Sequence, residues 1–551
     1  MKERIYNNGL PVSMGKIDKD QQIISWFKEW SDRKVFNGQN IKELLAFEDF
    51  SFWWFFDFYL YNHLKNGLQG DMKERKKSSF KKAIAPAYIA FRTIIRKFYG
   101  HVFMNISRDG KTKTVMVLSH RMNWRKSRKD MNKKEDQLFG GIFENLKRQE
   151  IEVVAVDRNH VVGLKTLKEK KRFQKGLWGP VETYLKFSDI INAYKVNRTM
   201  KKRFNKYRNN EIYTNSFLMN EKNMFQYMKE IMEFAFSYIP MEAFIQIKAI
   251  ENAIEKDQIS LVILSHEYGV LGKAALIAGK KMQVPIIVMQ HGIIHPNHMG
   301  YYHTQNEIGD WAPEYCPIPD KIVVYGKYTH DILIDVCHYP PDSVEIIGQP
   351  KYDILKEPGR IYYREEFYTK NGIPPKKINI LVTTQPFPIY NHRTIFLRNI
   401  LKFAQIPDVQ LIVKPHPGED IAWHKKIMEE ENIKVPVIDP KSDIFEAIYA
   451  SDIIATFSST TATEAIIMDK IVLIVNLTGQ EDPMPYVSSG AAVGVYNKEF
   501  LVHTLQNILK DEDLRNNLQL GRERFIRDHL YKIDGKSTDR FVELVKRMVK
   551  Q

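Results

Sequence analysis

Residues 409–420 read VQLIVKPHPGED, an apolar run that passes directly into a lysine, a histidine and two prolines. The apolar run predicts a buried strand, and the two prolines fix the backbone φ angle on either side of His416. Gly418 permits the tight turn that follows. We therefore expect Lys414 and His416 at the carboxyl end of a buried parallel strand, which is where α/β proteins bind their ligands.

Runs of β-branched residues alternate with helix-like segments on both sides of this stretch, a pattern typical of parallel α/β layers. A proline-rich connector at residues 373–377 separates the expected strands into two series. The first series is expected at residues 114–119, 151–156, 260–265, 285–290, 321–325 and 344–347. The second series is expected at residues 378–383, 409–413, 435–438, 452–456 and 471–475. The sequence therefore predicts an α/β protein with two Rossmann-like domains that face a cleft.

Three regions are expected along the chain. Residues 1–110 are predicted to form an N-terminal helical region that is rich in aromatic and basic residues. Residues 111–347 are expected to form the N-terminal Rossmann-like domain, with a basic helical insertion near residues 160–257. Residues 348–551 are expected to form the C-terminal Rossmann-like domain.

A hydroxyl-rich stretch, FSSTT at residues 457–461, follows another expected strand and leads into a helical segment. Hydroxyl and backbone N–H groups at the start of a helix bind anions, so Ser458, Ser459 and Thr460 are candidate phosphate ligands. Helix capping is the alternative interpretation, although a single Ser or Thr suffices for it. Glu464 lies one turn further on, where it could accept hydrogen bonds from ribose hydroxyls or act as a capping carboxylate.

Residues 284–300 read VPIIVMQHGIIHPNHMG, and here too an expected strand ends in polar residues. His291 lies at this end, and Glu267 follows the expected strand that comes before it in the chain. These two residues are a candidate general base and its neighbour. The histidines of the stretch have no Asp, Glu or Cys among them, and Pro296 would break a helix that stacked them. No metal ion is therefore expected.

Four features together resemble the two-domain GT-B glycosyltransferases. They are the KPHP turn, the SSTT turn with its downstream glutamate, the QHG stretch and the GQPKYD junction at residues 348–353. The sequence is most similar to capsule- and teichoic-acid-type enzymes: 3-deoxy-octulosonic acid transferases, bacterial sialyltransferases and CDP-glycerol glycerophosphotransferases. The resemblance covers residues 258–480. It implies a cytidine-activated donor in the C-terminal domain and a glycan or lipid-linked acceptor in the N-terminal domain.

The resemblance also implies roles for individual residues. It assigns donor binding to Gln385, Lys414, His416, Pro417, Ser458, Ser459, Thr460 and Glu464. The catalytic base of the family is a carboxylate in the N-terminal domain, and Glu267, beside His291, is the nearest positional match. No Asp-x-Asp motif follows an expected strand, so we expect metal-independent transfer in which His416 and Lys414 stabilise the charge on the leaving phosphate.

The net charge of +16 is concentrated in residues 1–210, where Lys and Arg outnumber Asp and Glu. Such a region indicates a polyanionic partner. The aromatic run FEDFSFWWFFDFYLY at residues 47–61 and the basic cluster at residues 73–82 predict docking to an acidic membrane surface. The alternative for the aromatic run is a helix packed onto the first Rossmann-like domain. No nucleic-acid-binding module is recognisable, so no nucleic acid partner is expected.

Two cysteines, an N-terminus without an apolar signal segment and the lack of a long apolar run predict a cytoplasmic protein, peripheral on the inner face of the cytoplasmic membrane. The combined hypothesis is an inverting glycosyltransferase that builds a cell-surface polysaccharide, such as a capsule, or a glycolipid and needs no cofactor besides its nucleotide-activated sugar. The alternatives are a CDP-glycerol-type polyol-phosphate transferase, a sugar-nucleotide 2-epimerase and a non-catalytic, membrane-associated carbohydrate-binding protein.

Overall fold

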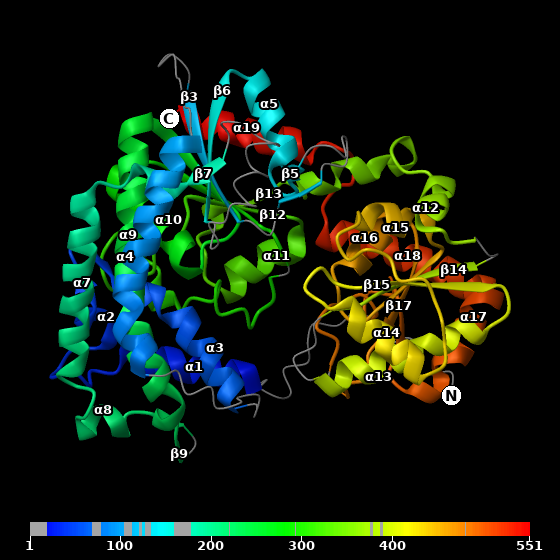
Figure 1. Cartoon of the computed structure of the whole chain (residues 1–551), viewed down its shortest axis with the longest axis horizontal. Coiled ribbons are helices and arrows are strands. Elements are labelled where there is room, and N and C mark those ends of the chain that lie inside the picture. The colour runs from blue at the N-terminus through cyan, green and yellow to red at the C-terminus, as the bar shows by residue number, and fades with distance from the viewer. Residues whose placement is uncertain are drawn as a thin grey trace. The chain divides into compact units, whose positions relative to one another are not determined.

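The fold is that of a computed structural model of the chain. The structure describes residues 19–68, 79–103, 113–120, 124–126, 134–158, 178–219, 221–292, 294–374, 378–385, 390–479 and 481–550. The described chain divides into two compact units (Figure 1). The small unit consists of Tyr325–Lys327 and Gly348–Ser537, and the large unit contains the other described residues.

The large unit is built on a seven-stranded parallel sheet with the strand order β13-β12-β11-β10-β3-β6-β7. Its strands are β3 (Lys113–His120), β6 (Ile151–Arg158), β7 (Trp178–Pro180), β10 (Ile259–Leu264), β11 (Ile286–Met289), β12 (Lys321–Val324) and β13 (Val344–Ile346). Each strand expected in the first series is present. The short edge strand β7 was not predicted, because its sequence WGP lacks a β-branched run and ends in proline.

Alternate residues of the longer strands point into two separate cores, which explains why these strands are almost continuously apolar. On one face, residues such as Val262 pack in a core shared with α9 (Phe225–Asp257) and α10 (Gly269–Met282). On the other face, residues such as Leu261 pack with α5 (Gly140–Arg148) and α19 (Ser537–Lys550). The last helix of the chain thus lies in the large unit, which differs from the expected assignment of residues 348–551 to one domain.

Helices from the N-terminal region and from the segment before β10 form a further layer of the large unit (Figure 1). They are α1 (Lys19–Asp32), α2 (Ile41–Leu44), α3 (Asp57–Leu68), α4 (Ser79–Phe103), α7 (Phe187–Asn205) and α8 (Glu211–Asn215). The long helix α9 connects this layer to the sheet, because it packs against α3, α4 and α7 and also against α10.

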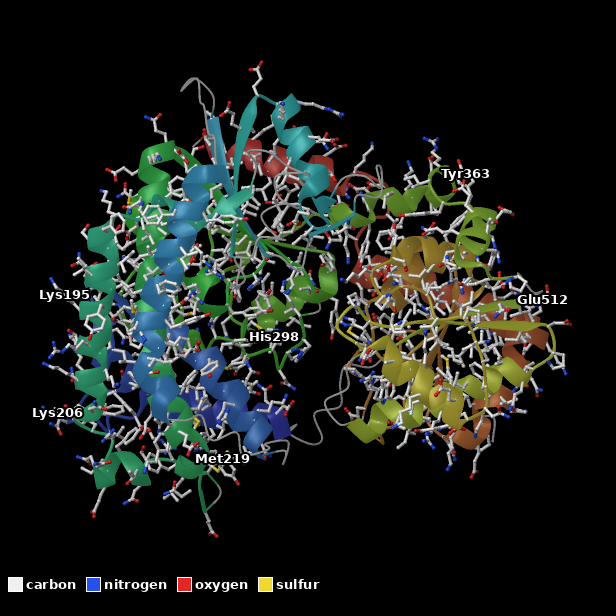
Figure 2. The ribbon with its side chains drawn as sticks, viewed as in Figure 1. Lys195, Lys206, Met219, His298, Tyr363 and Glu512 are labelled. Atoms are coloured by element: carbon white, nitrogen blue, oxygen red, sulfur yellow. The ribbon has the colours of Figure 1, made fainter. Side chains whose placement is uncertain are left out.

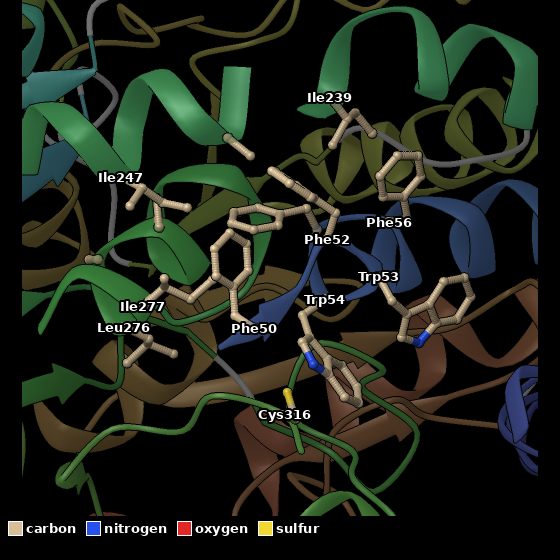
Figure 3. Packing of buried hydrophobic residues seen from close by; sticks show 14 of the residues in the cluster. Phe50, Phe52, Trp53, Trp54, Phe56, Ile239, Ile247, Leu276, Ile277 and Cys316 are labelled. Carbon is tan, nitrogen blue, oxygen red and sulfur yellow. The ribbon is translucent and has the colours of Figure 1, made fainter. Parts of the chain in front are cut away.

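The aromatic run at residues 47–61 lies in the core of the large unit. It contributes buried rings beside α9 and α10 (Figure 3), among them Phe50, Phe52, Trp53, Trp54 and Phe56. Rings in this position cannot reach a lipid headgroup. Packing onto the first Rossmann-like unit is therefore correct for this run, and the expected docking of this run to a membrane is wrong. The side chains of the basic cluster at residues 73–82 lie outside the described residues.

The small unit is built on a five-stranded parallel sheet with the order β15-β14-β16-β17-β18. Its strands are β14 (Ile378–Thr383), β15 (Val409–Lys414), β16 (Ile453–Thr456), β17 (Ile471–Val475) and β18 (Val493–Val495). Its α-helices are α12 (Arg364–Asn371), α13 (Tyr390–Leu401), α14 (Ile421–Glu430), α15 (Ile444–Ala450), α16 (Thr461–Ile467), α17 (Leu501–Lys510) and α18 (Glu512–His529). The predicted fold class of two Rossmann-like parallel sheets is confirmed.

The strand expected at residues 435–438 is wrong. This segment forms a single parallel bridge between Val437 and Val413 of β15. Val413 N donates to Pro436 O at 2.9 Å, and Ile438 N donates to Val413 O at 3.0 Å. Pro436 has no N–H group of its own, so the segment lacks one of the donors that a longer ladder needs.

Candidate functional site

The predicted donor residues lie at one edge of the sheet in the small unit. Strands β15, β14 and β16 are neighbours, and because they are parallel their carboxyl ends meet at this edge. Gln385 follows β14, and its Nε2 donates to Ser458 Oγ, which follows β16, at 3.0 Å. Ser458 N donates back to Gln385 Oε1 at 3.2 Å. The two hydrogen bonds hold the ends of β14 and β16 together.

The hydroxyl-rich turn joins β16 to α16. Ser459 Oγ accepts a hydrogen bond from Thr461 N at 3.2 Å, so helix capping accounts for one of the hydroxyls. Thr461 Oγ1 lies 2.8 Å from Thr383 Oγ1 on β14. Thr460, which precedes Thr461 in the chain, is half-buried. Helix α16 has only 7 residues, so its dipole is weak. The groups of this turn that can bind a phosphate are therefore its hydroxyl groups.

His416 lies on an exposed turn at the end of β15, with Pro417 exposed beside it. Its Nδ1 accepts a hydrogen bond from Gly418 N at 3.0 Å. A neutral imidazole that accepts at Nδ1 carries its proton on Nε2. His416 can therefore donate a hydrogen bond through Nε2 to an anionic oxygen, which is the chemistry that the sequence predicted for this turn.

Glu419, to which the sequence assigned no role, fixes the conformation of the His416 turn. Its Oε2 accepts hydrogen bonds from His416 N at 3.0 Å and from the Thr384 hydroxyl, and its side chain is almost fully buried. Glu419 Oε1 lies 2.9 Å from Arg393 Nε, and the Arg393 guanidinium lies 3.5 Å from the centroid of the Trp423 ring. The position of an acidic residue three residues after His416 can be recognised in the sequence as a turn signal. The contacts of Glu419 with distant residues cannot be recognised there.

Replacing Glu419 by glutamine tests this positioning role. Glutamine keeps an oxygen for the His416 N–H group but removes the charge that pairs with Arg393. We expect the sugar transfer that the sequence predicts to slow by up to about 100-fold, because small displacements of a catalytic group have effects of this size. Steady-state kinetics measure the change, and Glu430→Gln, which removes an exposed ion pair with Arg398, is the matched control. Equal rates for both variants would contradict the role of Glu419.

Lys414 and Glu464 have structural partners in this arrangement. Lys414 is buried, and its Nζ donates to Asp439 O, Pro440 O and Ser442 Oγ at 3.2, 3.1 and 3.1 Å. An ammonium group has three donors, so these contacts occupy all of them. This arrangement does not support the predicted contact between Lys414 and a donor phosphate.

Glu464 is also buried, and its Oε1 lies 3.2 Å from Nζ of Lys351 in the 3-10 helix η7 (Pro350–Lys356). This ion pair links η7 to α16. Lys351 therefore gives the Glu464 carboxylate a partner without a bound ribose. The pair could not be predicted from the sequence, because the two residues are far apart in the chain.

Glu267, the predicted base, lies inside the core of the large unit. Its side chain is 0% exposed and accepts a hydrogen bond from the Tyr339 hydroxyl. His303 Nε2 lies 3.8 Å from Glu267 Oε1, and burial lowers the pKa of His303 to about 4. A fully enclosed carboxylate cannot take a proton from an acceptor hydroxyl. The assignment of Glu267 as the base therefore conflicts with the structure.

His291 is exposed at the end of β11, in contrast to Glu267. Its Nε2 lies 3.4 Å from the Tyr268 hydroxyl, and its ring centroid lies 5.1 Å from that of His266. The nearby His298 packs against aromatic rings, and burial lowers its pKa to about 4. Across the described ranges, His, Cys, Asp and Glu side chains form no group of three or more that could hold a metal ion.

One protein-family model matches part of the chain. Residues 231–350, which begin within α9 and end at the first residue of η7, match the model of glycosyltransferase family 4. No curated protein shows a significant match to the chain. The match agrees with the resemblance to GT-B glycosyltransferases that the motifs indicated.

Many solved structures resemble the chain at low sequence identity. A complex of Staphylococcus aureus MnaA with UDP is 14% identical, with 80% of this chain and 97% of that chain covered and a TM-score of 0.47. The wall teichoic acid polymerase TagF is 13% identical, with coverage of 84% and 97% and a TM-score of 0.44. A glycosyltransferase from Rickettsia africae is 13% identical, with coverage of 80% and 100% and a TM-score of 0.46.

Proposed function

We propose that the protein is an inverting, metal-independent glycosyltransferase that moves a sugar from a cytidine-activated donor to a surface polysaccharide or a glycolipid. The observation that carries the proposal is the His416 turn, an exposed imidazole whose backbone is fixed by the buried Glu419. It lies at the same sheet edge as the Gln385–Ser458 pair. The family match of residues 231–350 supports glycosyl transfer as the class of reaction.

The proposed chemistry needs charge stabilisation and a proton acceptor. In an inverting transfer, the acceptor oxygen bonds to the anomeric carbon while the bond from that carbon to the nucleotide phosphate breaks. Negative charge grows on the departing phosphate, where His416 Nε2–H and the hydroxyls of Ser459 and Thr460 would donate hydrogen bonds. Because Glu267 is enclosed, His291 is the remaining predicted candidate for the group that accepts the proton.

A nucleotide screen tests the donor assignment. CMP or CDP is expected to raise the melting temperature of the protein more than UMP or UDP, because ligands that bind only the folded state stabilise it. Differential scanning fluorimetry with the four nucleotides measures this order. A larger shift with the uridine nucleotides would exclude the cytidine assignment and leave the fold unaffected.

Product analysis tests the type of transfer. Incubation with a cytidine-activated sugar is expected to give a glycosidic linkage in the product, which mass spectrometry and NMR identify. A phosphodiester product formed only from CDP-glycerol would favour the polyol-phosphate transferase instead.

A further inference from the structure

Helix α4 has an unusual distribution of polar and apolar side chains. Its buried face carries Arg96, whose Nη1 donates to Glu182 Oε1 at 2.7 Å, and Arg92 beside it forms an ion pair with Glu242. Thr93 is also buried on this side. A surface helix of a globular protein normally places its apolar residues inward. Ile89 and Tyr99 are also buried on α4, but five further large apolar residues of this helix are exposed.

They form one stripe on the exposed face of α4. The exposed side chains are Ile84, Tyr88, Phe91, Ile95 and Phe98, and Phe91 is 63% exposed. Their spacing of four, three, four and three residues places them on one side of the helix, over a length of about 20 Å. Single exposed apolar residues are ordinary, but a contiguous apolar stripe marks an interaction surface.

Helix α7 extends this surface and adds positive charge. Phe187, Ile191 and Tyr194 are exposed at the same helical spacing, and the ring centroids of Phe98 and Phe187 are 6.2 Å apart. Further along α7 the exposed charged side chains are Lys195, Arg198, Lys201 and Lys202. Figure 1 shows the two helices in the large unit, and Figure 2 labels Lys195 on α7 and Lys206 just beyond it.

Among the described residues of α4 and α7, no acidic side chain is exposed. The sequence of α4 contains no Asp or Glu. The one acidic residue of α7 is Asp189, which is buried and accepts hydrogen bonds from Lys186 N and Asn252 Nδ2. The surface therefore combines exposed aromatic and branched aliphatic side chains with a row of exposed cations.

We propose that the exposed faces of α4 and α7 bind the surface of a membrane that contains anionic lipids. The apolar stripe would enter the headgroup region, and the cations of α7 would contact lipid phosphates and carboxylates. Within the described residues, none of the helices is long and apolar enough to cross a membrane. Binding of vesicles requires no nucleotide, so this inference goes beyond the proposed function.

Two other partners fit the surface less well. Nucleic acid offers phosphates to Lys195 and Arg198, but Ile84, Ile95 and Ile191 have no counterpart on a phosphate backbone. A second copy of the chain could cover the apolar stripe. In a symmetric dimer through this face, however, the cations of the two α7 helices would lie close to one another and repel.

Vesicle co-sedimentation of the full chain tests the proposal. The probes are vesicles of phosphatidylcholine alone and of phosphatidylcholine with about one third phosphatidylserine. We expect binding to the anionic vesicles, weaker binding in high salt, and little binding to the neutral vesicles. Phe91→Gln with Phe98→Gln, and separately Lys195→Glu with Arg198→Glu, should each weaken binding at least about tenfold.

Matched controls use exposed residues of the small unit. Two double variants change the same kinds of side chain there: Phe500→Gln with Leu520→Gln, and Lys498→Glu with Lys510→Glu. Both should bind the anionic vesicles as the unmodified protein does. Circular dichroism of each variant verifies folding. Equal loss in test and control variants, or no binding to anionic vesicles, would overturn the proposal. Two further results would overturn the proposal. One is that the protein is a dimer which the double variant Phe91→Gln with Phe98→Gln dissociates. The other is that the protein binds random-sequence duplex DNA and does not bind vesicles.

Discussion

Replacing His416 by alanine is expected to slow sugar transfer by about 100- to 1,000-fold, the loss typical of removing one donor that stabilises a developing negative charge. The imidazole is exposed, and Gly418 N donates to its Nδ1, so the proton of the neutral ring lies on Nε2. Alanine removes that donor and leaves the backbone contact between His416 N and Glu419 in place. Turnover of the proposed cytidine-activated sugar under saturating conditions measures the effect.

Two comparisons separate catalysis from stability in this experiment. His503→Ala removes another exposed histidine from the small unit, on α17, and should leave the transfer rate unchanged. The melting temperature of His416→Ala should stay close to that of the unmodified protein, because the side chain is exposed. A transfer rate within about twofold of normal would show that His416 does not stabilise the leaving phosphate.

Replacing Arg96 by alanine is expected to lower the free energy of unfolding of the large unit by about 3–5 kcal/mol. Arg96 and Glu182 form an ion pair in which the side chains are 0% and 1% exposed. Removal of the guanidinium leaves the Glu182 carboxylate buried without its partner. Urea unfolding followed by tryptophan fluorescence measures the change, since every tryptophan except Trp423 lies in the large unit.

A double replacement distinguishes a buried charge from simple loss of packing. Among the described residues, Arg96 Nε and Nη2 and Glu182 Oε2 find no hydrogen-bond partner, so the pair is incompletely satisfied. Arg96→Met combined with Glu182→Leu should therefore restore the stability to within about 1 kcal/mol of the original. The exposed pair of Arg398 and Glu430 provides the reference, and Arg398→Ala should change the stability by less than about 1 kcal/mol. A double variant as unstable as Arg96→Ala would refute the argument.

The strands were predictable because burial on both sides of a parallel sheet requires continuous apolar runs. That pattern located β10, β14 and β15 to within a residue at each end. It gave the wrong result at residues 435–438, where the apolar run contains a proline that a ladder cannot use. It also missed β7, whose three residues have no pattern of their own.

The candidate site was predictable in part. Parallel strands place their carboxyl ends at one edge, so the sequence predicted that the residues following β14, β15 and β16 would lie near one another. It did not identify Glu419 as the support of the His416 turn. It also did not show that the donors of Lys414 are occupied by Asp439, Pro440 and Ser442. The roles of charged residues depend on partners that only the folded chain brings within reach.

The amino-acid sequence by itself determined two parallel α/β sheets and the turns that follow their strands, because periodicity and turn residues act over a few positions in the chain. Only the tertiary structure decided which polar and aromatic side chains face solvent. In the folded chain, Glu267 and most rings of the aromatic run at residues 47–61 are buried, whereas Phe91 and its apolar neighbours on α4 are exposed. The physical reason is that the burial of a side chain is set by the packing of distant segments, on which local composition has little influence.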